Sequence, residues 1–326
     1  MHAADTRRAA YTLTLRSPRV RYGRGTARTD LPAELDRIGA RRIMLVATAR
    51  AAGGHDDVLS PVADRIAGHV SDVRRHVPAE VVRSATALTR DIDTDCLLAI
   101  GGGSATGTAK AVAVETGLPI VALPTTYAGS EQTPVYGITE NGVKRTARSA
   151  QALPQTVLLD PDLSVGLPAE IARASAANAL AHAATGVFAA NHSPLTDLLA
   201  AEAVRLLGRG LQEMDREDLT QGGHLAGTVL AHAGSSAHHS VCHILGGAFD
   251  LPHAETHAAL LPHTLAYLQE EQLDRAAALG LPDAAAAVAN LLDGVRLPEA
   301  SLGQATELLA PVMDPTRAAQ LLNEAW

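Results

Sequence analysis

Histidines and one asparagine are the side chains of this sequence that point most clearly to chemistry. Asn178 and His182 are spaced i, i+4, so they are predicted to share one face of a helix. His239 and His243 have the same spacing and are expected to point into one cleft. Neutral imidazole ligates metal ions, and imidazole also transfers protons near neutral pH. The spacing therefore indicates either a metal site or a metal-free acid–base site.

A further histidine, His253, lies beyond the segment GGAFDLP, which starts at Gly246. The two glycines are predicted to break the helix that carries His239 and His243 and to bring His253 back toward it. A single histidine is usually a packed or surface residue. Several histidines on helix faces next to a Gly-Gly break are more typical of a functional site.

A glycine turn is predicted between a buried strand and a helix in the sequence CLLAIGGGSATGTAK. Gly101, Gly102 and Gly103 allow close backbone approach to a ligand, and Ser104 is predicted to be the helix N-cap. The free N–H groups of a first helical turn attract phosphate, and Lys110 of the same helix could reach a negative ligand. The pattern is neither the dinucleotide G-x-G-x-x-G nor the P-loop motif. A phosphate site and a tight turn without a ligand are both compatible with this segment alone.

A second polar turn, LPTTYAGSEQTP, follows the next predicted strand and carries the hydroxyls of Thr125, Thr126 and Thr133. Open α/β sheets bind ligands at the carboxyl ends of their parallel strands. Solvated loops are rich in the same residue types. Two polar turns after successive strands nevertheless favour a cofactor site.

The pattern of apolar residues changes near residue 165. Before it, continuous apolar runs bounded by turn residues are typical of strands buried on both faces of a parallel sheet. We predict strands at 42–48, 96–100, 119–123 and 156–159, with helical stretches such as 79–89 and 105–116 between them. After it, Ala- and Leu-rich helical stretches follow, at 169–191, 194–209 and 219–245. The expected fold is an α/β nucleotide-binding domain with a parallel sheet (1–165) and an all-α helical domain carrying the histidine cluster (166–326).

Composition excludes several classes of function. The chain has 326 residues, is 47% hydrophobic and carries a formal net charge of −8, so neither disorder nor binding to nucleic acid or an anionic membrane is expected. Its 2 cysteines rule out a disulfide scaffold or a cysteine-rich zinc module. No apolar segment is typical of a signal peptide or a membrane span, so a cytoplasmic location is expected.

Together these segments resemble the iron-containing alcohol dehydrogenase superfamily, which has a dehydroquinate synthase-like fold, and within it the maleylacetate reductases. The resemblance is carried in chain order by RVRYGRGT, GGGSATGTAKA, LPTTYAGSEQTPVYGIT, LPQTVLLDPDLSVGLP, ASAANALAH, HHSVCHILGGAFDLPHAETHAALLPHTLAY and NEAW. Metal-dependent members have an Asp three residues after the Ser of the GGGS turn. This chain has Gly107 there, as maleylacetate reductases do.

The resemblance implies an active site in the cleft between the two domains. In the α/β domain, Gly101, Gly102, Gly103 and Ser104 would hold the coenzyme pyrophosphate, Thr125, Thr126 and Thr133 would line the nicotinamide side, and Lys144 would lie near the ribose. Metal-dependent relatives hold iron or zinc with an Asp and three His, and the matching positions here are Asn178, His182, His239 and His253. A neutral amide thus replaces the only anionic ligand, which implies a metal-independent enzyme, although three imidazoles can still bind zinc.

The implied reaction, a step of aromatic catabolism, is conjugate reduction of maleylacetate, an anionic unsaturated oxo acid, to 3-oxoadipate by NADH or NADPH. Negative charge develops on the conjugated carbonyl oxygen, so hydrogen-bond donors must stabilise it and an acid must supply a proton. We assign the acid to His243, with His239, His253, His182 and Asn178 shaping the pocket. The resemblance also implies a homodimer.

Four positions depart from the family pattern. Thr185 replaces a Glu, Ser240 replaces the Lys of the reductases, and Ala176 and Ala177 replace Gly-Met. Loss of a site lysine weakens the expectation of a dianionic substrate. One alternative is therefore a repurposed member of a specialised biosynthetic pathway, such as a cyclase or lyase without net reduction. The other is a non-catalytic nucleotide-binding protein.

The choice of coenzyme stays open. The first predicted strand ends at Thr48 without an acidic residue that would bind a free ribose hydroxyl. Arg50, two residues later, could meet a 2′-phosphate. NADH and NADPH are both retained.

Overall fold

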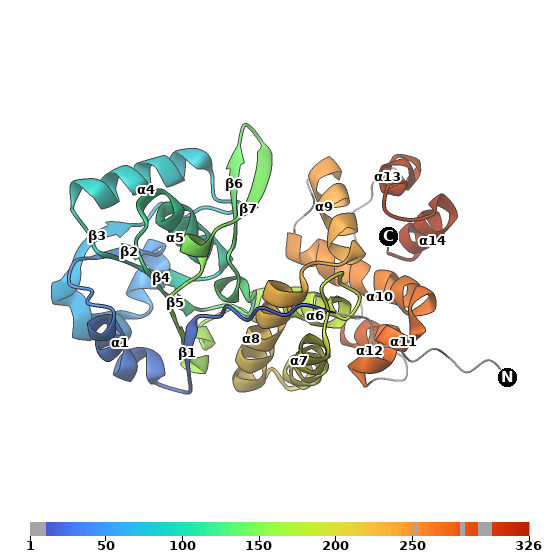
Figure 1. Ribbon diagram of the computed structural model, residues 1–326, viewed down its shortest axis with the longest axis horizontal. Coiled ribbons are helices and arrows are strands. Elements are labelled where there is room, and N and C mark those ends of the chain that lie inside the picture. The colour runs from blue at the N-terminus through green and yellow to red at the C-terminus, as the bar shows by residue number, and fades with distance from the viewer. Residues whose placement is uncertain (1–10, 250, 252, 281–283, 293–301, 326) are drawn as a thin grey trace.

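The computed structural model describes residues 11–249, 251, 253–280, 284–292 and 302–325. Two lobes lie side by side (Figure 1): a sheet flanked by helices from the first half of the chain, and a helical lobe from the second half. The expected fold class, an α/β part with a parallel sheet followed by an all-helical part, is confirmed.

The central sheet has six parallel strands in the order β1-β8-β5-β4-β2-β3. Their bounds are β1 (Arg19–Tyr22), β2 (Ile43–Val46), β3 (Ile66–Val70), β4 (Cys96–Gly101), β5 (Ile120–Pro124) and β8 (Thr156–Leu159). Every residue of β2, β4, β5 and β8 is buried. Continuous burial explains why these four strands read as unbroken apolar runs and were predicted, whereas the more exposed β1 and β3 were not.

Helices cover both faces of this sheet. Their bounds are α1 (Thr26–Arg37), α2 (Ala49–Gly53), α3 (Asp56–Leu59), α4 (Ala79–Asp91) and α5 (Gly103–Thr116). Side chains of β4 alternate between two cores: Cys96 and Leu98 pack with α1 and α3, while Leu97 and Ala99 pack with α4 and α5. The sheet is therefore fixed from both sides, and the turns at its strand ends have a rigid support.

A two-stranded antiparallel hairpin, β6 (Val135–Glu140) and β7 (Val143–Arg148), follows the second polar turn. The sequence did not predict it, because all six residues of β7 are exposed and show no apolar alternation. Figure 1 shows the hairpin on the side of the sheet lobe that faces the helical lobe.

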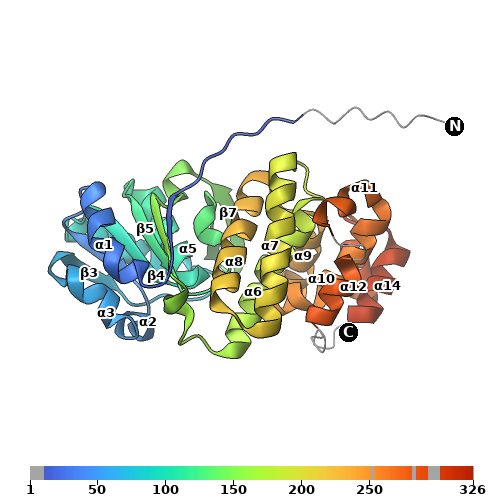
Figure 2. The ribbon, with the colours of Figure 1, turned by 90° about the horizontal axis from the view of Figure 1, so that it is seen from below.

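The helical lobe is built around Ala and Leu side chains, as the low aromatic content of 2% requires. Its helices are α6 (Ala169–Gly186), α7 (Pro194–Glu213), α8 (Arg216–Ala233), α9 (Ala237–Phe249), α10 (His253–Glu271), α11 (Leu273–Ala276), α12 (Ala284–Leu291), α13 (Leu302–Leu309) and α14 (Pro315–Ala325). Figure 2 shows α6, α7 and α8 side by side next to the sheet lobe. No helix in the described part of the chain is long and apolar enough to span a bilayer.

Two helix predictions are wrong. The stretch 219–245 is not one helix, because Gly234 takes φ +87 and ψ −167 and separates α8 from α9. In contrast, Gly246 and Gly247 do not break α9, which continues to Phe249. Glycine costs about 1 kcal/mol inside a helix. Burial of Val241 and Leu245 against α10, α13 and α14 outweighs that cost.

Candidate active site

A cleft of about 790 Å³ opens at the carboxyl ends of β2, β4 and β5. Both predicted polar turns line it, through Gly101, Gly102, Gly103, Ser104, Thr125 and Thr126. The turns are joined by a hydrogen bond in which the Thr125 backbone N–H donates to the Gly101 carbonyl oxygen, at 3.0 Å. The structure therefore brings the two segments together at the sheet edge where α/β proteins bind ligands.

The three positions of the first turn, Gly101, Gly102 and Gly103, favour glycine for different structural reasons. Gly101 has φ +145, a conformation that side chains disfavour. A Cβ on Gly102 would lie 2.9 Å from Cγ2 of Thr126, so the two turns are packed too closely for a side chain there. A Cβ on Gly103 would meet nothing within 4 Å, so it would project into open space at a residue that lines the cleft. This cradle fits a pyrophosphate that approaches the backbone.

The predicted cap of α5 is wrong by two residues. The N-cap is Gly102, whose carbonyl accepts from the N–H groups of Ala105 and Thr106, and Ser104 lies within the first turn. Glycine accommodates the extended backbone of an N-cap, so the helix starts at Gly103. Ser104 still lines the cleft. First-turn N–H groups lack intrahelical partners in any helix, so an anion site at this helix end is retained.

Lys110 points away from the cleft, contrary to the expectation that it could reach a negative ligand. The residue is 1% exposed, and its ammonium group donates to the carbonyl oxygens of Ser130, Thr133 (2.7 Å) and Val135 (2.8 Å). Burial lowers the pKa of Lys110 to about 7, and the nearby Glu131 carboxylate opposes that shift. Three carbonyl acceptors match the three protons of an ammonium group. Lys110 therefore anchors the second polar turn to α5.

Thr133 and Lys144 lie apart from the lining of this cleft. Thr133 is buried, and its hydroxyl donates to the Ser130 carbonyl at 3.2 Å, beside the Lys110 ammonium. Lys144 is exposed on β7, and desolvation lowers its pKa. Its positive charge acts on His243 of α9. The hairpin and α9 thus face each other across the two lobes (Figure 1).

His243 is an exposed residue of α9. Desolvation lowers the pKa of its imidazole, and the positive charge of Lys144 lowers it further. Neutral imidazole is therefore the main form at pH 7, with one N–H to donate. The partner of its i, i+4 pair, His239, is instead buried inside the helical lobe.

Four buried imidazoles, which we call the histidine cluster, meet where α6, α9 and α10 pack: His182, His238, His239 and His257. The rings of His182 and His239 stack with centroids 4.4 Å apart and an interplanar angle of 17°. Asn178 extends the cluster, because its side-chain amide lies 3.4 Å from Nε2 of His182. Of the predicted pocket residues, the structure brings Asn178, His182 and His239 together. The side chain of His253, at the start of α10, lies outside the described residues.

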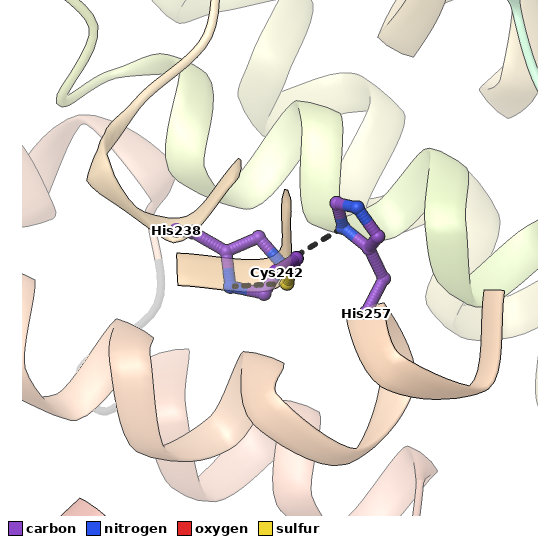
Figure 3. A group of neighbouring side chains, drawn as sticks. All are labelled: His238, Cys242 and His257. Carbon is purple, nitrogen blue, oxygen red and sulfur yellow. Dashed lines mark hydrogen bonds between the residues drawn. The ribbon is translucent and has the colours of Figure 1, made fainter. Parts of the chain in front are cut away.

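His238, Cys242 and His257 were not assigned a role from the sequence, yet they form a compact buried group (Figure 3). Their ligand atoms all lie within 4.8 Å of one another, which is close enough to share a metal ion. Hydrogen bonding accounts for the same arrangement, since Nε2 of His238 and Nδ1 of His257 are 3.1 Å apart. Burial also raises the pKa of the Cys242 thiol, which disfavours the thiolate that a metal needs. The available sequence signal was the i, i+4 spacing of His238 and Cys242.

The positions that match metal ligands in relatives do not fit an iron or zinc centre as they are arranged among the described residues. Imidazole lone pairs lie in the ring plane, so the nearly parallel rings of His182 and His239 direct them side by side rather than at one ion. Asn178 contributes a neutral amide where an anionic oxygen would balance the charge of the ion.

Comparisons with known proteins agree with this geometry. A family model described as iron-containing alcohol dehydrogenase matches residues 17–161, and one for the C-terminal part of Fe-containing alcohol dehydrogenases matches residues 172–308. The chain is 41% identical to maleylacetate reductase of Burkholderia cepacia over 312 residues, covering 91% of this chain and 88% of that protein. It is 43% identical to maleylacetate reductase 1 of Cupriavidus pinatubonensis over 265 residues, covering 79% and 75%. The crystal structure of maleylacetate reductase from Agrobacterium tumefaciens superimposes with a TM-score of 0.91, 35% identity and coverage of 98% and 99%.

Proposed function

The chain belongs to the iron-containing alcohol dehydrogenase family, as an oxidoreductase similar to the maleylacetate reductases, and we propose that it reduces an unsaturated oxo acid with NADH or NADPH. Maleylacetate is the proposed substrate, because relatives about 40% identical over most of the chain carry that name. One observation carries the proposal: a cleft lined by Gly101, Gly102 and Gly103 opens at the carboxyl ends of the parallel strands, where a dinucleotide would bind.

Residues of the sheet lobe hold the coenzyme in this proposal. The turn from Gly101 to Ser104 binds the pyrophosphate through backbone N–H groups, while Thr125 and Thr126 line the path toward the nicotinamide. The family resemblance assigns Lys144 to the ribose next to the nicotinamide. Because the charge of Lys144 also acts on His243, that ribose and the candidate acid would lie near each other. The bound nicotinamide supplies a hydride to the alkene carbon.

Residues of the helical lobe handle the charge and the proton. Conjugate reduction places negative charge on the carbonyl oxygen of the substrate, and a fixed N–H donor stabilises it. The N–H of His243 is the proposed hydrogen-bond donor to that oxygen. The imidazolium form of the same ring, a minor fraction at pH 7, gives up the proton that completes the carbon–hydrogen bond and is left as neutral imidazole. Lys144 adds a positive charge beside it, which suits an anionic substrate. His182, His239, His253 and Asn178 shape the pocket.

A direct test is a panel of unsaturated oxo acids, including maleylacetate, incubated with NADH or NADPH while the loss of coenzyme absorbance is followed. Turnover of maleylacetate by protein pretreated with a chelator would support the proposed reaction, its substrate and its independence of metal. Tight binding of NADH without turnover of maleylacetate would point to a different substrate, in line with the changes at Thr185 and Ser240. Absence of binding to either coenzyme would reject the oxidoreductase proposal.

Metal independence gives a first prediction. We expect the purified protein to contain less than one equivalent of iron or zinc and to keep its kcat after treatment with a chelator, because Asn178 is neutral and the rings of His182 and His239 do not converge. Elemental analysis and kinetics check this. One equivalent of metal together with activity lost on chelation would contradict it. If metal is bound but turnover does not depend on it, the group of His238, Cys242 and His257 is the candidate site. The metal content of Cys242→Ser should then fall.

Coenzyme preference gives a second prediction. Three exposed arginines, Arg28, Arg50 and Arg75, line the cleft, and Arg50 follows the end of β2, where the adenosine ribose lies in related α/β folds. We expect Arg50→Ala to raise the KM for NADPH about tenfold, because a charge-assisted bond to the 2′-phosphate is lost, and to leave the KM for NADH nearly unchanged. An equal rise in the KM for NADH and for NADPH would show that Arg50 does not bind the 2′-phosphate.

A further inference from the structure

We propose that Thr264, His238 and His257 form a hydrogen-bonded chain that sets the tautomer of His257 and holds the rings of His182 and His239 in place at the active site. None of the three is expected to touch substrate or coenzyme, so all three are positioning residues. The idea that they serve catalysis rests on the proposed function, whereas the chain itself rests only on the contacts described next.

The chain begins at a threonine inside a helix. Thr264 of α10 is 1% exposed, and its hydroxyl lies 2.9 Å from the Leu260 carbonyl oxygen and 2.6 Å from Nδ1 of His238. The hydroxyl has one proton, and the carbonyl oxygen can only accept. Both contacts are hydrogen bonds only if Thr264 donates to Leu260 and Nδ1–H of His238 donates to the threonine oxygen. The opposite assignment leaves two oxygen atoms facing each other without a proton.

The tautomer of His238 then determines that of His257. With its proton on Nδ1, a neutral His238 offers a lone pair on Nε2. Nδ1 of His257 lies 3.1 Å from that nitrogen, so this contact is a hydrogen bond only if Nδ1 carries the proton and donates. The Cys242 thiol also lies 3.6 Å from the same nitrogen. Both rings are fully buried at 0% exposure, so no solvent competes for these bonds. A hydroxyl on α10 thus fixes the protonated nitrogen of a ring seven residues earlier on the same helix, through α9.

The ring of His257, once its orientation is fixed, packs against the rings of His239 and His182. Its centroid is 4.6 Å from that of His239, with an interplanar angle of 58°, and 6.3 Å from that of His182. His239 in turn stacks on His182, which contacts the Asn178 amide. A ring of His257 that is free to rotate would no longer support the His239 face. In the proposed function, the chain therefore orients the rings of His182 and His239 without joining the chemistry.

The experiment combines two measurements on the full chain labelled with 15N-histidine. Long-range 1H–15N correlation spectra report the tautomer of each histidine, and steady-state kinetics report kcat and KM. The variants are Thr264→Val, which keeps the shape and removes the hydroxyl, and Thr264→Ser, which restores the hydroxyl. Thr89→Val is the matched control, because Thr89 is also buried in a helix and donates to its i−4 carbonyl, at 2.7 Å, but lies on α4 in the sheet lobe.

We expect wild-type His238 and His257 to be Nδ1–H tautomers. Thr264→Val should change the His238 signal and lower kcat roughly tenfold, the effect of one lost hydrogen bond, with the coenzyme KM unchanged. Thr264→Ser should restore both readouts, and Thr89→Val should alter neither. An Nε2–H tautomer of wild-type His257, or unchanged tautomers in Thr264→Val, would overturn the chain. Altered tautomers with a normal kcat would overturn its role in catalysis. If wild-type protein reduces no unsaturated oxo acid, the proposed function fails, and the spectra still decide the chain.

Discussion

His243→Ala is expected to lower kcat on the true substrate by about 10²–10⁴-fold, the usual range for a positioned acid or base. His243 is exposed on α9, and the positive charge of Lys144 acts on its imidazole. Removal of its ring deletes both the donor to the developing enolate and the source of the proton. The coenzyme Kd should barely change, because the nucleotide cleft belongs to the sheet lobe.

His263→Ala is the control for this variant. His263 lies on α10, and its Nδ1 is 3.1 Å from a carboxylate oxygen of Glu324 on α14, away from the histidine cluster. Its replacement should leave kcat within about twofold, since a surface contact of this kind contributes little. Normal turnover in His243→Ala together with impaired turnover in His263→Ala would show that His243 is not the acid.

Gly103→Val is expected to abolish coenzyme binding, with a Kd raised more than about 100-fold, while the fold is kept. A Cβ at Gly103 would meet nothing within 4 Å outside its chain neighbours and its own helix turn, so the fold is expected to tolerate a side chain there. It would occupy the space that a pyrophosphate needs in order to reach the backbone. Titration of NADH fluorescence measures the Kd, and circular dichroism confirms the fold.

Two further variants separate steric blocking from general damage. Gly303→Val on α13 also meets nothing within 4 Å but lies outside the cleft, so it should bind NADH normally. Gly102→Val should abolish binding as well, yet it must also displace Thr126, so some loss of stability is expected. Unchanged NADH affinity in Gly103→Val would remove the basis for the proposed coenzyme site.

Sequence patterns were sufficient where one physical cause dominates. The strands at β4, β5 and β8 were predicted within one residue at each end, because burial on both faces demands unbroken apolar runs. The glycine turn was located for a similar reason, since only glycine allows the backbone of Gly101 at φ +145. The pairing of Asn178 with His182 followed from helix geometry alone.

Predictions failed where distant segments decide the outcome. The meeting of His238 with His257 depends on how α9 packs against α10, which no spacing along one helix reveals. The burial of Lys110 follows from carbonyls of a loop 20 to 25 residues later. The continuation of α9 through Gly246 reflects packing against α13 and α14 rather than local propensity.

The contrast between the two lysines makes lysine chemistry selective in this protein. Lysine occurs only at positions 110 and 144. Lys110 is 1% exposed and its ammonium is held by carbonyl oxygens, so amine-reactive reagents have no access to it in the folded state. Lys144 is exposed, and its lowered pKa leaves more of the reactive free amine near neutral pH. An acylating reagent is thus directed to Lys144, the exposed lysine of the two, so a single fluorophore can be attached at one known lysine on β7.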